Sequence, residues 1–188
     1  LPPSELLPDD AVAEASARVL GRRGALQYAP TEGYDPLRDW IAGDRLGGVD
    51  RAGVLVTHGS QQALDLLVRV LVDPGDVVVT ETPTYLGMLQ ALGGSGARIV
   101  GVSTDADGLD AEELEAALAE GLRPKLAYLA PTHQNPSGAV MSAARRAHLG
   151  ELAERYGFVV VDDDPYRELG FEAAPRRLRE VVPPGLAV

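Results

Sequence analysis

The sequence predicts an α/β protein, with a three-layer α/β/α arrangement around a mostly parallel sheet. Short apolar runs alternate along the chain with longer amphipathic segments, as in repeated strand–helix units. The run Phe158–Val161 has no polar interruption, which is typical of a strand buried on both faces of a parallel sheet. An acidic cluster follows this run directly, at the edge where ligands bind to such sheets.

Each predicted element follows from this alternation and from clear stop residues. The strands are expected at Gly53–Thr57, Val77–Glu81, Arg98–Val102, Lys125–Ala130 and Phe158–Asp163. The helices are expected at Asp10–Leu20, Pro36–Leu46, Ser60–Val72, Tyr85–Leu92, Asp110–Gly121 and Ser142–Tyr156. An Asp-Pro-Gly-Asp turn at residues 73–76 ends a helix before a strand, and Asp110 and Ser142 are expected N-caps.

The composition points away from several classes of partner. The 17 basic and 28 acidic residues give a net charge of −11, which disfavours a surface for nucleic acid or anionic lipid. We therefore expect a small-molecule ligand. The chain has no cysteine, its three histidines are too scattered to predict a metal site, and no apolar run is long enough to span a bilayer. A cytoplasmic location is expected.

The end of the chain predicts a further strand. Residues 183–188, Pro-Pro-Gly-Leu-Ala-Val, are typical of a turn that leads into a buried strand beginning at Leu186. A parallel sheet that lacked its last strands would expose an apolar edge, which folded proteins normally cover. We therefore expect the sequence to be a fragment.

A turn between a predicted strand and a predicted helix is a candidate phosphate site. In Thr57–Ala63, the residues Gly59, Ser60 and Gln61 would present N–H groups and short side chains at the positive end of a helix. The same Gly-Ser pair is also common in a routine turn and cap. The segment supports a phosphate site only in combination with the other motifs of the chain.

The acidic cluster is the second candidate. Asp163 and Tyr166 lie three apart where a buried strand ends, so a carboxylate could pair with a protonated ring nitrogen and a phenol could donate to a ring oxygen. The alternative is a solvated turn, but three adjacent acids repel one another without a cationic partner. Asn135, in Asn-Pro-Ser-Gly, would place an amide on the same edge, or form an ordinary Asn-Pro turn.

Taken together, spaced motifs resemble the fold type I pyridoxal-phosphate aminotransferases, nearest to the 2-aminoadipate and broad-specificity branch. The motifs occur in order over essentially the whole chain: Tyr28–Gly33 with Leu37 and Arg38, Thr57–Gln62, Thr82–Tyr85, Gln134–Gly138 with Arg145 and Arg146, and Asp163–Tyr166. The resemblance implies an incomplete large, cofactor-binding domain over residues 1–188. Residues 1–50 would form a helical segment that leads into it, and the small C-terminal domain would be absent.

The resemblance also implies roles for individual residues toward pyridoxal 5'-phosphate. Gly59, Ser60 and Gln61 would hold the phosphate, and Tyr85 would stack on the pyridine ring. Asn135 and Tyr166 would bind its phenolic oxygen, and Asp163 its protonated nitrogen. Tyr28 would reach the phosphate in the neighbouring subunit of a homodimer, unless it packs on the helix that follows it.

No catalytic residue is expected within the sequence itself. In the family, the Schiff-base lysine lies a few dozen residues beyond the Asp-x-x-Tyr motif, and the arginine that binds the substrate carboxylate lies in the small domain. Lys125 is the only lysine, and it precedes a buried strand at the opposite edge of the sheet. The resemblance thus implies amino-group transfer between an amino acid and a 2-oxo acid by the intact protein, not by this chain alone.

Two other functions stay open. The chain could be the aminotransferase-like effector domain of a helix-turn-helix transcription regulator, for which His133 and Gln134 before Pro136 are compatible. A basic DNA-binding domain ahead of residue 1 would distinguish that case. It could also be a remnant that binds no cofactor and acts as a scaffold, although Ser60, Tyr85 and Asp163 are all present.

Overall fold

The structure is a computed structural model that describes residues 3–188. Its internal contacts divide the chain into two compact units, one ending at Thr57 and the other spanning His58–Val188. Each unit is described separately below. The predicted domain extents remain predictions.

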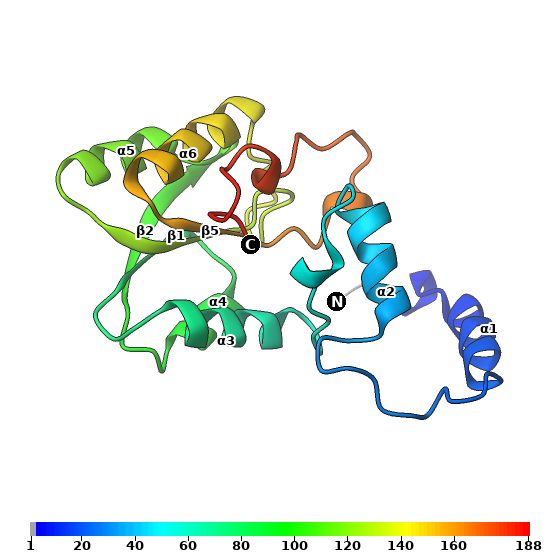
Figure 1. The fold of residues 1–188 in the computed structure, drawn as a ribbon. Helices are drawn as coiled ribbons and strands as arrows, with labels where there is room; N and C mark the ends of the chain where they lie inside the picture. Colours follow the sequence, from blue (N-terminus) through cyan, green and yellow to red (C-terminus); the bar gives the residue numbers. More distant parts are fainter. Residues whose placement is uncertain (1–2) are drawn as a thin grey trace. The chain divides into compact units, whose positions relative to one another are not determined.

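The second unit is built on a sheet of order β3-β2-β1-β4-β5 (Figure 1). Its strands are β1 (Val77–Thr82), β2 (Arg98–Asp105), β3 (Gly108–Leu109), β4 (Pro124–Leu129) and β5 (Val159–Asp162). All neighbouring pairs are parallel except β2 and the two-residue β3, which pair antiparallel. The predicted mostly parallel sheet is confirmed.

Helices cover both faces of this sheet, as the three-layer prediction requires. These are α3 (Ser60–Leu71), α4 (Leu86–Leu92), α5 (Ala111–Ala119) and α6 (Ala143–Tyr156), with 3-10 turns at Arg167–Leu169 and Leu178–Glu180. Figure 1 shows α3 and α4 on one side of the sheet and α5 and α6 on the other.

Two buried clusters fill the spaces between these layers. The cluster under α3 and α4 consists of Leu64, Val68, Val72, Val78, Met88, Leu92, Leu126, Tyr128 and Val161. The cluster under α5 and α6 includes Val79, Ala127, Leu129, Leu149, Phe158 and Val160. Successive residues of one strand enter opposite clusters because strand side chains alternate between the two faces. An uninterrupted apolar strand is therefore buried on both sides.

Local signals fix the element ends. Asp110 accepts hydrogen bonds from the N–H groups of Glu112 and Glu113, and Ser142 accepts one from Arg145, so both predicted N-caps are confirmed. The turn at residues 73–76 closes when Asp73 N–H donates to Asp76 Oδ2 at 2.9 Å, with Gly75 at a φ of 91°.

The strand expected from Leu186 is present only as an isolated bridge beside β5 and is not a strand of the five-stranded sheet. Val160 N–H donates to Leu186 O at 2.7 Å, and Val188 N–H donates to Val160 O at 2.9 Å. Val160 and Ala187 form a parallel bridge, so residues 186–188 lie along the free side of β5.

The first unit is mostly helical. It contains α1 (Asp9–Leu20), α2 (Asp35–Trp40), a π-helical turn at Ile41–Arg45 and 3-10 turns at Ser4–Leu6 and Arg51–Gly53. No helix among residues 3–188 is long and apolar enough to cross a membrane.

The strand predicted at Gly53–Thr57 is wrong. Val54 N–H donates to Arg51 O in a turn, and the Val54 carbonyl accepts from the buried Arg38 guanidinium at 2.8 Å. Val56 N–H donates to Glu32 O. Backbone groups that a ladder would need are thus bonded to a turn, a side chain and a neighbouring loop.

Candidate functional site

Three parallel strands of the second unit end at the same edge of the sheet. The strands β1, β4 and β5 are adjacent and parallel, so the segments that carry Tyr85, Asn135 and Asp163 leave the sheet side by side (Figure 1). Gln134 joins two of these segments by donating from Nε2 to Pro83 O at 2.7 Å. The predicted convergence at one edge is confirmed, and Lys125 lies at the start of β4, at the other edge.

The three adjacent acids face different surroundings, which explains how the fold tolerates them. Asp162 accepts from Leu178 N–H at 3.1 Å, and Asp164 pairs with Arg167 at 3.2 Å. Asp163 instead accepts from Tyr128. Alternation along the chain therefore separates Asp162 and Asp163 onto opposite faces of the sheet. Repulsion is further reduced because Asp164 has a cationic partner, which the sequence analysis had not identified.

Asp163 lies on the face covered by α3 and α4. Its Oδ2 accepts from the Tyr128 hydroxyl at 2.6 Å, and Tyr128 belongs to the cluster beneath those helices. Burial raises the pKa of the Asp163 carboxyl, while the tyrosine hydrogen bond lowers it and the neighbouring Asp164 raises it. The half-buried carboxylate is thus held by a specific donor, unlike a solvated turn.

The turn before α3, the candidate phosphate site, begins the helix with a glycine at a positive φ. Gly59 is the N-cap of α3 at a φ of 86°, where a side chain would be strained, and Ser60 and Gln61 are exposed on the first helical turn. Gly59 supplies no side-chain acceptor as the N-cap, and Ser60 and Gln61 follow it at the positive end of the helix, where an anion is stabilised.

Tyr85 is packed against this helical turn. Gln61 donates from Nε2 to Gly87 O at 2.9 Å, which ties the start of α3 to α4. A Cβ atom on Gly87 would overlap the Tyr85 ring and approach Gln61 Oε1, so both side chains lie over this glycine. The structure therefore brings Gln61 and Tyr85 together, and Tyr85 also packs on the cluster that contains Tyr128.

Asn135 and Tyr166 line one open hollow at the same edge. The hollow is lined by His133, Gln134, Asn135, Pro136, Gly138, Tyr166, Leu169, Gly170 and Phe171. Asn135 is half-buried, and Tyr166 is 36% exposed. The structure thus places the two proposed ligands of the phenolic oxygen together.

Arg146 secures the loop that carries Asn135. Its guanidinium is buried and donates to Pro131 O at 2.6 Å, to Thr132 Oγ1 at 3.1 Å and to Met141 O at 2.9 Å. Burial lowers the pKa of this guanidinium. These bonds give Arg146 a structural role behind the loop.

Glu81 is a buried acid that the sequence analysis did not single out. Only 1% of its surface is exposed, Oε2 accepts from Ala130 N–H at 2.9 Å, and Oε1 has no hydrogen-bond partner among residues 3–188. Burial raises its pKa to about 7, and the nearby charge of Asp163 acts in the same direction. A charged residue near the end of a strand that begins with three valines was the available signal.

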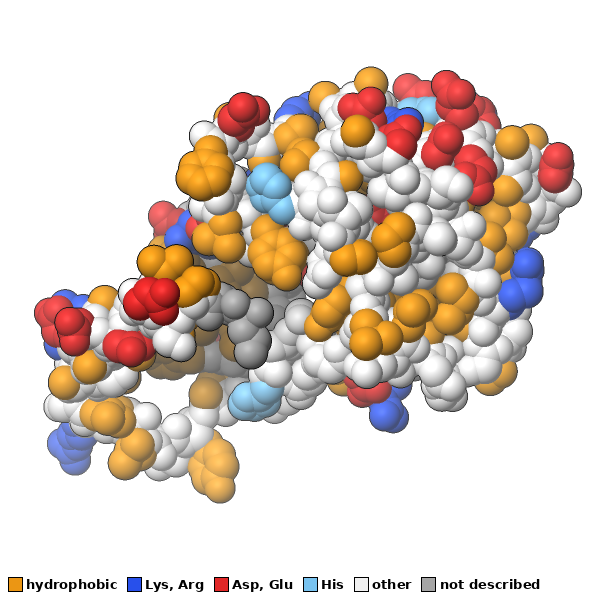
Figure 2. All heavy atoms as spheres, turned by 180° about the vertical axis from the view of Figure 1, so that it is seen from behind, with side chains coloured by type: hydrophobic (Ala, Val, Ile, Leu, Met, Phe, Trp, Pro, Cys, Tyr) orange, Lys and Arg blue, Asp and Glu red, His pale blue; other side chains and the backbone are white. Residues whose placement is uncertain are grey.

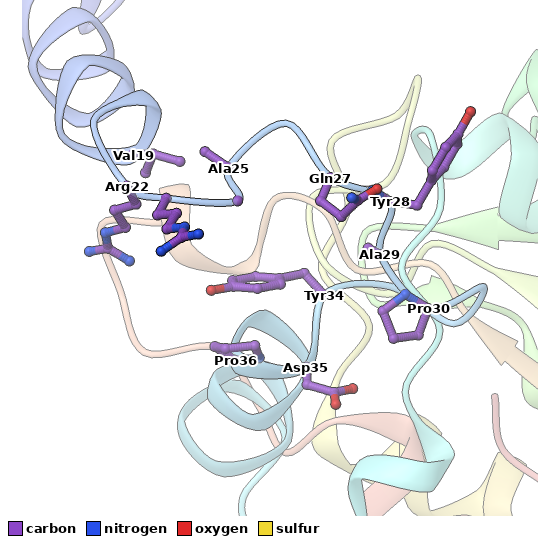
Figure 3. Close-up of a pocket in the computed structure, with 12 residues that line it drawn as sticks. Val19, Arg22, Ala25, Gln27, Tyr28, Ala29, Pro30, Tyr34, Asp35 and Pro36 are labelled. Atoms are coloured by element: carbon purple, nitrogen blue, oxygen red, sulfur yellow. The ribbon is translucent and has the colours of Figure 1, made fainter.

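Tyr28 lies in the first unit and is 98% exposed. It borders a hollow with Val19, Arg22, Tyr34, Asp35 and Pro36, and Figure 3 shows its ring extending away from Tyr34. The alternative that Tyr28 packs on the following helix is therefore wrong for this structure.

The molecular surface agrees with the acidic composition. On the face drawn in Figure 2, acidic side chains gather in several places while the basic ones lie singly. Over residues 3–188, no group of three or more His, Asp or Glu side chains is placed to hold a metal ion.

Comparison with known proteins decides the family. Residues 3–185 match the family model described as aminotransferase class I and II. The chain belongs to this family. It is 45% identical over 176 residues to the 2-aminoadipate transaminase of Thermus thermophilus, and 39% identical over 185 residues to aromatic-amino-acid aminotransferase 1 of Thermococcus litoralis. These matches cover 93% of this chain but 44% of each relative.

Solved aminotransferases share the fold. The structure of LysN, an α-aminoadipate aminotransferase of T. thermophilus complexed with N-(5'-phosphopyridoxyl)-L-leucine, matches with a TM-score of 0.88 and 44% identity, over 96% of this chain and 46% of that one. A kynurenine aminotransferase of Pyrococcus horikoshii matches with a TM-score of 0.89 and 36% identity, over 100% and 49%. The second unit therefore has the architecture of the large domain of fold type I aminotransferases.

Family membership and the phosphopyridoxyl ligand of the T. thermophilus structure imply pyridoxal 5'-phosphate as the cofactor. The aminotransferase residues present here fit that group. Asp163 Oδ1 has no hydrogen-bond partner in the described part of the chain, so it can accept from a protonated ring nitrogen. Gly59 leaves open space, with no atom within 4 Å of a Cβ atom added there, beside the first turn of α3.

Proposed function

We propose that the whole protein is a pyridoxal-phosphate-dependent aminotransferase that moves an amino group between an amino acid and a 2-oxo acid. One observation carries the proposal. Asp163 is held by Tyr128 at the carboxyl edge of the sheet, on the face whose helix α3 begins with the Gly59–Gln61 turn. A nitrogen-binding carboxylate and a phosphate-binding turn on one face match the two ends of the cofactor.

The proposed roles follow the chemistry of each side chain. Gly59, Ser60 and Gln61 bind the phosphate, and Tyr85 stacks on the ring. The Asn135 amide and the Tyr166 hydroxyl donate to the phenolic oxygen. All of these residues belong to the second unit. Two observations support the proposed roles: Gln61 and Tyr85 lie together over Gly87, and Asn135 and Tyr166 line the same hollow.

Asp163 has the central role. The bound cofactor supplies an electron sink for the charge released when a substrate Cα–H bond breaks. Asp163 keeps a proton on the ring nitrogen, since an ionised carboxylate stabilises a cation beside it. Tyr85 excludes water from one face of the ring, and the donors at its other substituents fix its orientation.

The remaining features of the proposal lie outside this chain or between chains. The chain spans less than half of the relatives it matches, so the Schiff-base lysine and the substrate-binding arginine are assigned to the rest of the protein. Tyr28, exposed in the first unit, is assigned to the phosphate site of a second subunit in a homodimer. A cytoplasmic location completes the proposal.

The test is a single-turnover reaction of the whole protein. Mixing the cofactor-loaded protein with an amino acid should change its visible absorbance as the amino group is transferred. Asp163→Ala should remove most of this change, whereas Asp107→Ala, an exposed acid in the turn between β2 and β3, should retain it. An Asp163→Ala variant that transfers at the parent rate would refute the assignment.

A further inference from the structure

The hydrogen bond between Tyr128 and Asp163 is not explained by the proposed contacts with cofactor. Tyr128 is the next-to-last residue of β4, paired with Thr80 of β1 and Val161 of β5, and none of its surface is exposed. A buried phenol needs a partner for its hydroxyl. Its partner here is Asp163 Oδ2 at 2.6 Å, although Asp163 lies 35 residues further along the chain.

The direction of this hydrogen bond is fixed. Burial and the Asp163 charge raise the pKa of the Tyr128 hydroxyl well above its ordinary value of 10.0, so it keeps its proton and donates. Oδ2 of Asp163 is therefore occupied throughout the physiological pH range. Oδ1 has no hydrogen-bond partner in the described structure and is the oxygen to which no donor is bound.

The surroundings make such a donor necessary. Asp163 is half-buried, and the groups that face it or Tyr128 are acidic or aromatic: Glu81 in β1, Tyr85 before α4, and Asp164 next in sequence. Burial and Asp164 both favour the neutral form of Asp163, and the Tyr128 hydroxyl favours the ionised form. No Lys or Arg pairs with Asp163 among the described residues.

We propose that Tyr128 is a positioning residue for the cofactor site: its hydroxyl occupies Oδ2 of Asp163 and thereby presents Oδ1, ionised and in a fixed orientation, to the ring nitrogen. This inference rests on the proposed function and adds a residue to it. Tyr128 acts through Asp163 and needs no contact with the cofactor. The buried ring serves packing, while the hydroxyl serves the site.

Tyr128→Phe separates these two roles because it keeps the ring and removes only the hydroxyl. In the cofactor-free protein, carboxyl carbon NMR should show the pKa of Asp163 rising by about one unit, since a hydrogen bond to a charged group is lost. The dissociation constant for pyridoxal phosphate should rise about tenfold for the same reason. Tyr156→Phe, which removes a hydroxyl from α6 on the opposite face, should change neither quantity.

The outcomes distinguish the inference from the function beneath it. A parent protein that does not bind pyridoxal phosphate overturns the proposed function and this inference with it. A parent that binds, with a Tyr128→Phe variant of equal affinity and unchanged Asp163 pKa, overturns only the positioning role. If Tyr128→Phe does not fold, 3-fluorotyrosine at position 128 provides the second test. As a stronger donor it should lower the Asp163 pKa, and an unchanged pKa would overturn the inference.

Discussion

At the scale of single residues, the site contains several acidic side chains that are buried or half-buried. Asp162, Asp163 and Glu81 all lie at the carboxyl edge of the sheet, and burial raises the pKa of each. Only Asp163 is bonded to a tyrosine hydroxyl. Chemically similar acids therefore have different hydrogen-bond donors, because each strand position places a different group beside the carboxylate.

Glu81 should make stability depend on pH. Its ordinary pKa of 4.5 rises to about 7 in the folded protein, so between these values the folded state holds a proton that the unfolded chain has released. The free energy of unfolding should therefore fall as pH rises through this window, by about 3 kcal/mol in total from this residue. Glu81→Gln should remove that part of the pH dependence. Urea denaturation of the parent and of Glu81→Gln at pH 5 and pH 8 measures the free energy of unfolding of each protein.

The comparison of parent and variant isolates Glu81 from Asp162, whose pKa of about 6 gives a slope of the same sign. Gln at position 81 retains an oxygen that can accept from Ala130 N–H. Equal loss of stability between pH 5 and pH 8 in both proteins would show that Glu81 is already ionised in the folded state.

The sequence could single out Asp163, Asn135 and Tyr166, because polar residues at the end of an apolar strand stand out. It could not single out Tyr128. In the run Leu126–Ala130 a tyrosine is indistinguishable from a core aromatic, and its bond to Asp163 depends on the register of β4 against β5. Long-range register is a property of the folded sheet, so this partner emerged only from the structure.

At the scale of elements, α4 shows how a helix positions the site. Gly87 lies in its first turn beneath Tyr85 and Gln61. Alanine normally favours a helix over glycine by about 1 kcal/mol, but here its methyl group would overlap both side chains.

Gly87→Ala should therefore destabilise the protein by about 1–3 kcal/mol, the usual cost of overpacking, and weaken retention of the cofactor by displacing Tyr85. Gly94→Ala is the matched control, because no atom lies within 4 Å of a Cβ atom there. Thermal unfolding and cofactor release compare the two variants. Similar values for both would mean that Tyr85 and Gln61 move aside without cost.

Most elements followed from the sequence because their signals are local. Apolar runs gave β1, β2, β4 and β5, and the caps Asp110 and Ser142 set the starts of α5 and α6. The two-residue β3 has too few residues to form a pattern, and its pairing with β2 depends on the turn between them. Gly53–Thr57 had an apolar pattern, but its backbone groups are bonded to a turn, a side chain and a loop.

At the scale of the whole molecule, the second unit contains the sheet, both buried clusters and the proposed cofactor residues except Tyr28. The spaced motifs were enough to predict the family by resemblance. The meeting of their residues at one edge follows separately, because parallel strands bring their carboxyl ends to the same edge of a sheet. The place of Tyr28 could not be predicted in the same way, because its proposed ligand belongs to a second subunit.

Equilibrium dialysis of the whole protein against pyridoxal phosphate, for the parent and for Asp163→Ala, shows whether this edge of the sheet binds the cofactor. We expect saturable binding in the parent. Loss of the carboxylate at the ring nitrogen should weaken that binding at least about tenfold. The absence of saturable binding in the parent, or equal affinity in the two proteins, would contradict the claim that this edge of the sheet is a pyridoxal-phosphate site.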